Sequence, residues 1–98
     1  MALTLESSEP MFNSGFTESP FVLERGGWYY LSVTSYPVDW DASFVFRSRS
    51  PFAFTSRPVA RIAAHAPEWV EDPGTGDLFV THCGAGQGGV WISRVEGL

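Results

Sequence analysis

Short runs of apolar and β-branched residues, separated by turn-forming residues, recur along the chain and predict an all-β fold. The clearest run is Trp28–Ser35, which follows the apolar residues 21–24 across the sequence Arg25-Gly26-Gly27. Aromatic and β-branched side chains favour strands, and the two glycines accept the positive φ angles of a tight turn. The pattern therefore predicts an antiparallel hairpin. No stretch of about ten residues shows the 3.6-residue period of an amphipathic helix.

The same pattern predicts further elements on both sides of this hairpin. Strands are expected at residues 43–48, 58–63, 68–72, 77–82 and 90–95, and a short one at residues 2–6. Residues 36–42 contain Pro37 and two aspartates and are interpreted as a loop that carries Trp40. Residues 73–76 are predicted to form a turn, and residues 84–89 a glycine-rich loop.

The second half of the chain resembles the first at an offset of 47 residues, the distance from Glu18 to His65. The alignment pairs Glu18 with His65, Pro20 with Pro67, Val22 with Trp69, Leu23 with Val70, Glu24 with Glu71, Leu31 with Val80 and Ser32 with Thr81, and places residues 44–46 near 90–92. A repeat of this length with up to four strands is in the range of β-propeller blades. The alternative is that two unrelated β-meanders align loosely.

The repeat divides one partial propeller domain into three parts. Residues 1–17 form an isolated strand and loop, residues 18–64 a four-stranded blade, and residues 65–98 a three-stranded blade. Because a closed propeller has roughly four to eight blades, two cannot close a ring within one chain. The isolated strand would then complete a neighbouring blade, either in a homo-oligomer or by folding back onto the last blade.

Composition and charge argue against several classes of function. The 98 residues suffice for one small domain or for a piece of a larger one, whose missing blades a longer chain would supply. The formal charge of −5, with six Arg and no Lys, argues against a nucleic-acid partner. Cys83 is alone, which excludes an intrachain disulfide and a cysteine metal cluster. No apolar run approaches the roughly 18 residues of a membrane span. The N-terminus lacks the basic region and apolar core of a secretion signal, so we expect a cytoplasmic location.

Two segments carry a resemblance to a known superfamily. The segment Glu-Ser-Pro-Phe-Val-Leu from Glu18, followed by Gly-Trp-Tyr-Tyr-Leu, resembles the Glu-Cys/Ser-Pro segment of the five-bladed propeller glycoside hydrolases. This superfamily comprises families 32, 43 and 68, with invertases, levanases, arabinanases and xylosidases. The segment His-Ala-Pro-Glu-Trp-Val from His65 is similar to the next blade. The resemblance covers residues 18–95 and implies a β-propeller glycosidase that acts on carbohydrate.

The resemblance further implies three carboxylates at a central channel. These are a nucleophilic or basic Asp, an Asp that stabilises the transition state, and a Glu that acts as general acid. Only the acid has a matching position here, Glu18. The chain has neither Asn-Asp-Pro nor Arg-Asp-Pro, and its aspartates are expected in loops and turns of other segments: Asp39, Asp41, Asp72 and Asp77. Because one carboxylate cannot supply both halves of glycoside cleavage, we expect the lone chain to be inactive.

Other residues are weaker candidates for the site. His65 takes the place of Glu18 in the second repeat, and the resemblance implies a channel His that helps to hold water or a metal ion such as calcium. A hydrogen-bonded structural His is the alternative, and no other cofactor is expected. Three aromatic residues could stack on the apolar face of a sugar, or pack between blades instead: Tyr36, Trp40 and Trp28. Glu68 could line the channel.

Cys83 lies next to His82 in the sequence, which suggests a cysteine nucleophile activated by a histidine. The geometry of a strand argues against this hypothesis. Adjacent residues of a strand point to opposite faces, so the two side chains are poorly placed to pair. We expect His82 to be structural. The function predicted is a glycoside-hydrolase-like propeller fragment, and the alternative is a small non-catalytic carbohydrate-binding or assembly module. A third hypothesis is an enzyme completed by a chain that supplies the missing aspartates.

Overall fold

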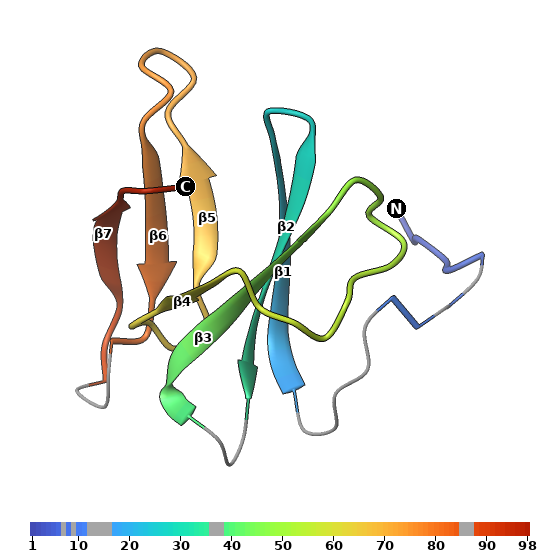
Figure 1. The fold of residues 1–98 in the computed structure, drawn as a ribbon, viewed down its shortest axis with the longest axis horizontal. Helices are drawn as coiled ribbons and strands as arrows, with labels where there is room; N and C mark the ends of the chain where they lie inside the picture. The colour runs from blue at the N-terminus through green and yellow to red at the C-terminus, as the bar shows by residue number, and fades with distance from the viewer. Residues whose placement is uncertain (7, 9, 12–16, 36–38, 85–87) are drawn as a thin grey trace.

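A computed structural model describes residues 1–6, 8, 10–11, 17–35, 39–84 and 88–98, without the side chains of residues 39 and 40. The described residues form an all-β fold of two antiparallel sheets that stand side by side (Figure 1). The first sheet contains β1 (Thr17–Arg25), β2 (Trp28–Ser35), β3 (Asp39–Ser48) and β4 (Ala60–Ile62) in that order. The second contains β5 (Glu68–Glu71), β6 (Leu78–His82) and β7 (Trp91–Val95). The described part of the chain includes no helix long and apolar enough to cross a membrane.

The hairpin predicted around the glycine pair is confirmed. Gly26 and Gly27 have φ angles of 61° and 80°, which residues with a Cβ rarely adopt, and β1 pairs with β2 on either side of them. The first strand is longer than the apolar run suggested. It begins at Thr17, and a register shift between Glu18 and Phe21 absorbs the irregularity around Pro20.

Two of the predicted elements are wrong. Residues 2–6 form no strand, and Leu3 and Leu5 are 86% and 87% exposed, because an alternating segment is stable only beside a partner strand. Residues 39–42 belong to β3 rather than to a loop, so Trp40 and Asp41 lie in a strand. The backbone of Asp39 pairs with Ser35 after a register shift, and this pairing overrides the low strand propensity of aspartate.

The hydrophobic core lies between the two sheets. It joins Tyr30 and Val45 of the first sheet to Trp69, Leu78 and Val80 of the second. A second cluster lies on the other face of the first sheet, where Phe54 packs against Leu31, Val33 and Phe46. The first sheet is therefore covered by apolar groups on both faces.

The two sheets repeat one register. Val22 lies opposite Leu31, and Leu31 opposite Phe46, in the first sheet. In the second, Trp69 lies opposite Val80, and Val80 opposite Ser93. The offset is thus 47 residues in the first and third strands (22 to 69, 46 to 93) and 49 in the second (31 to 80).

This register confirms the alignment predicted for the first two strands of each repeat. In the third strand it places Phe44 on Trp91, within the predicted neighbourhood but one position later than residue 90. The turns of both hairpins lie at the same end of the molecule, the top of Figure 1. The internal repeat of the sequence is therefore also present in the pairing of the strands.

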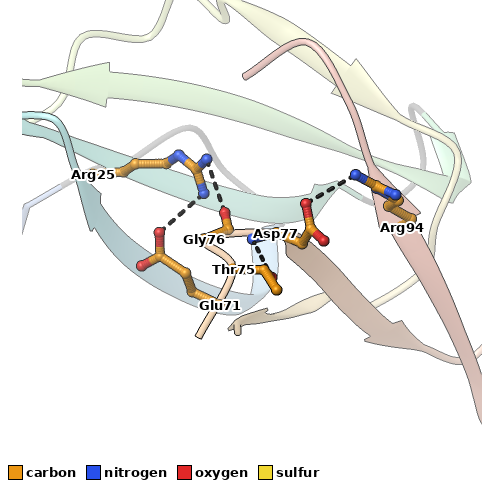
Figure 2. A network of polar contacts seen from close by, with 6 residues as sticks. All are labelled: Arg25, Glu71, Thr75, Gly76, Asp77 and Arg94. Atoms are coloured by element: carbon orange, nitrogen blue, oxygen red, sulfur yellow. Dashed lines mark hydrogen bonds and ion pairs between the residues drawn. The ribbon is translucent and has the colours of Figure 1, made fainter. Parts of the chain in front are cut away.

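A polar network joins the sheets at this turn end, and Figure 2 shows its members. The Arg25 guanidinium donates to Glu71 Oε1 at 3.1 Å and to the Gly76 carbonyl at 3.2 Å. Within the second sheet, Arg94 donates to Asp77 Oδ1 at 2.9 Å. The Arg25 and Glu71 side chains are 32% and 43% exposed, so water screens their attraction and the apolar core dominates the contact.

Candidate functional site

The same backbone distortion occurs near the start of β1 and just before β5. Ser19 has φ 53° and Ala66 has φ 52°, and each residue precedes a proline. The two positions are 47 residues apart, so they are equivalent in the repeat. A positive φ at a residue other than glycine costs about 1–3 kcal/mol and persists only where neighbouring contacts impose it. Each distorted residue directly follows a candidate site residue, Glu18 or His65.

The structure brings these two side chains together. Glu18 Oε1 lies 3.9 Å from His65 Nε2, and the side chains are 50% and 19% exposed. The distance is too long for a hydrogen bond but short enough for an ion pair when the imidazole is protonated. Repeat-equivalent positions, one in β1 and one in the segment that leads into β5, thus form one cluster, with the carboxylate on its solvent side.

A chain of buried hydroxyls fixes the His65 segment against the first sheet. Ser43 Oγ donates its single hydrogen to the Ala64 carbonyl at 2.8 Å. The 2.8 Å contact between the Thr34 and Ser43 hydroxyls must therefore have Thr34 as its donor. Thr34 Oγ1 in turn accepts from the Ala66 amide at 3.1 Å. Each group is donor and acceptor in turn, so the bonds polarise one another cooperatively.

Thr34 and Ser43 also connect this chain to the candidate acid. Glu18 pairs with Thr34 across β1 and β2, and Thr34 pairs with Ser43 across β2 and β3. Both hydroxyl residues are fully buried. Sequence reasoning missed them, because nothing in the local pattern distinguishes them from the other polar residues of β2 and β3.

An open hollow of about 260 Å³ lies beside Glu18. Its described lining consists of Pro10, Met11, Thr17, Glu18, Pro20, Leu31 and Val33. Glu18 supplies the one ionisable side chain among these residues, and most of the others are apolar. The hollow can therefore offer a ligand a carboxylate at its edge and an apolar floor.

The other predicted site residues do not join this cluster. Glu68 is exposed and alternates with Trp69, whose indole faces the first sheet, so the Glu68 side chain points to the opposite face. Tyr36 and the side chain of Trp40 lie outside the described residues. Their predicted sugar contacts stay predictions.

The aspartates do not pair with Glu18 in the described part of the chain. Asp41 is exposed on β3, which β2 separates from β1, so the backbones of the two acids lie about 10 Å apart. Asp72 Oδ1 accepts from the Gly74 amide at 2.8 Å, and Asp77 pairs with Arg94. These last two groups serve turn and sheet structure at the turn end.

The histidines differ in their surroundings. The Gly84 amide donates to His82 Nδ1 at 3.0 Å, so in the neutral ring the proton is on Nε2, which donates to Ser93 Oγ at 2.9 Å. These bonds agree with the structural role expected of His82. Among the described residues, no three His, Cys, Asp or Glu side chains gather closely enough to hold a metal ion. Calcium near His65 stays an expectation from the resemblance.

Comparisons of the chain with protein-family models, with curated proteins and with solved structures find no match. The functional argument therefore rests on the Glu18–His65 cluster, on the hollow that Glu18 borders and on the repeated backbone geometry at Ser19 and Ala66.

Proposed function

We propose that the chain is a two-blade piece of a glycoside-hydrolase-like propeller, with Glu18 in the place of the general acid of O-glycosyl hydrolysis. The observation that carries the proposal is the meeting of Glu18 and His65 at 3.9 Å, from equivalent positions of a repeat whose two sheets have one register. In a propeller the first strands of neighbouring blades surround a common channel. Two residues at equivalent positions of neighbouring blades, as proposed for Glu18 and His65, would both line this channel.

The chain binds carbohydrate in this proposal but does not cleave it alone. Glycoside cleavage requires an acid on the leaving oxygen and a second carboxylate about 5–10 Å away, across the sugar ring. The lining of the hollow supplies Glu18 but no second carboxylate among its described residues. A half-exposed acid beside an apolar surface still suits a sugar, because sugars present both hydroxyl groups and C–H faces.

Titration of the ¹⁵N-labelled chain with arabinose, xylose and fructose oligosaccharides tests the proposal. We expect saturable amide shifts around Glu18, Thr34 and His65. Glu18→Gln keeps the shape but removes the charge, and should weaken binding about threefold to tenfold by loss of a charge-assisted hydrogen bond. Glu68→Gln is the matched control, because Glu68 is an exposed acid on the far face.

Two outcomes would contradict the proposal. One is an absence of saturable shifts near Glu18 with every oligosaccharide of the series. The other is hydrolysis of an aryl glycoside by the wild-type chain at a rate that Glu18→Gln leaves unchanged, since the acid would then be elsewhere.

A further inference from the structure

Two arginines stack on one indole at the turn end of the first sheet. The Cζ atoms of Arg47 and Arg49 lie 4.4 Å and 3.7 Å from the centre of the Trp28 ring. Arg25 lies opposite Trp28 on β1, and Arg47 lies opposite Tyr30 on β3, so alternation places all these side chains on one face. Two of the chain's six arginines therefore contact Trp28, and a third lies opposite it, in a molecule of formal charge −5.

The contact with the indole does not use the N–H donors of the two guanidinium groups. A guanidinium interacts with a ring through its flat face, while its N–H donors point outward in its own plane. Arg49 Nη1 donates to the Gly27 carbonyl at 3.0 Å, and both arginines are exposed. Among the described residues neither Arg47 nor Arg49 forms an ion pair, whereas Arg25 is paired with Glu71.

Glu24, the acidic residue beside the turn, accepts a hydrogen bond from the backbone. Glu24 Oε1 accepts from the Gly27 amide at 3.3 Å, whereas Arg49 donates to the carbonyl of the same residue. Two positive charges thus contact one indole without an ion pair to a described carboxylate. Such an arrangement has a cost, because like charges repel.

The second sheet has a carboxylate at the position where the first sheet has an indole. Arg94 is the repeat equivalent of Arg47, at an offset of 47, and Asp77 is the equivalent of Trp28, at an offset of 49. In the second sheet the arginine meets the aspartate carboxylate at 2.9 Å (Figure 2). In the first sheet an indole takes the position of that carboxylate, and the same arginine is accompanied by Arg49.

We propose that Arg47 and Arg49 form a binding site for a small oxyanion, the phosphate or carboxylate group of a low-molecular-weight ligand. Trp28 holds the two guanidinium groups in place, and their outward N–H edges donate to the oxyanion. The net negative charge of the chain disfavours an extended polyanion and favours a single group. This site lies at the turn end, apart from the Glu18 hollow, and does not depend on the proposed function.

Titration with inorganic phosphate and with acetate, at constant ionic strength adjusted with chloride, tests the site. The indole N–H signal of Trp28, assigned with Trp28→Phe, and the side-chain signals of Arg47 and Arg49 should shift saturably. Arg47→Gln with Arg49→Gln should weaken binding about tenfold or more, since charge-assisted bonds to both guanidinium groups are lost. Arg57→Gln, an exposed arginine in the following segment, should leave the affinity unchanged.

Phosphate and acetate separate the two sources of the oxyanion. A stronger response to phosphate assigns a phosphorylated ligand, and a stronger response to acetate assigns a carboxylate. Arg47→Lys keeps the charge but loses the planar fork, and should bind more weakly than the wild type. The proposal is overturned if chloride alone produces the same shifts, if no shift saturates, or if the double variant binds as the wild type does.

Discussion

At the scale of single residues, the candidate site depends on distorted and buried groups rather than on its charged ones. Ser19 and Ala66 hold positive φ angles at equivalent positions, and Thr34 supplies the acceptor for the Ala66 amide. The Glu18–His65 distance therefore follows from backbone geometry that the hydroxyl chain maintains. The attraction between two partly exposed side chains contributes little to that geometry.

The first prediction concerns Thr34. Thr34→Val keeps the side-chain shape but leaves the Ala66 amide without its acceptor, so we expect the free energy of unfolding to fall by about 1–3 kcal/mol. Thr34→Ser retains the hydroxyl and loses only a methyl group, which makes it the matched control. Urea denaturation gives the free energies, and hydrogen exchange follows the Ala66 amide. Protection of that amide in Thr34→Val equal to that in Thr34→Ser would contradict the hydroxyl chain.

At the scale of elements, the sequence predicted the features that depend on local composition and on the repeat. Strand β2 was predicted to its ends because Trp28–Ser35 is densely aromatic and β-branched, and the repeat predicted that Glu18 and His65 are equivalent. The start of β3 was missed because backbone pairing outweighed the turn-like residues around Asp39. Thr34 could not be identified, since its partners lie on other elements and are set only by tertiary packing.

The second prediction concerns the contact of β5 with β2. Trp69 Nε1 donates to Ser32 Oγ at 2.9 Å, in a buried setting between the sheets. We expect Trp69→Phe to lower the free energy of unfolding by about 2–3 kcal/mol through the lost hydrogen bond and the residual cavity. Trp91→Phe, at a residue that is 49% exposed, should cost less than about 1 kcal/mol.

A double-mutant cycle isolates the hydrogen bond from the cavity. Ser32→Ala alone leaves the indole N–H unpaired, whereas in the Trp69→Phe background it removes a hydroxyl that already lacks its donor. The two changes should therefore be non-additive by about 1 kcal/mol. Strict additivity would show that the hydrogen bond does not join the sheets.

At the scale of the whole molecule, the two sheets form one folding unit because they share the core. Tyr30, Val45, Trp69, Leu78 and Val80 are buried against one another, and three of the five come from the second sheet. The second sheet buries its inner face only in this contact among the described residues, while Val70 and Ile92 of its outer face are 46% and 67% exposed. A three-stranded sheet with one covered face gains most of its stability from that cover.

The third prediction follows from this shared core. Urea unfolding monitored by ¹⁹F NMR of fluorotryptophan should show Trp28 in the first sheet and Trp69 in the second losing their native signals at one midpoint. Arg25→Gln removes the ion pair between the sheets, which is partly exposed, so it should lower the free energy of unfolding by less than about 1 kcal/mol without separating the midpoints. If the Trp69 signal disappeared at lower urea than the Trp28 signal, the sheets would be independent units. The 3.9 Å approach of Glu18 to His65 would then depend on the hydroxyl chain that binds Ala64 and Ala66 to the first sheet, and not on the shared core.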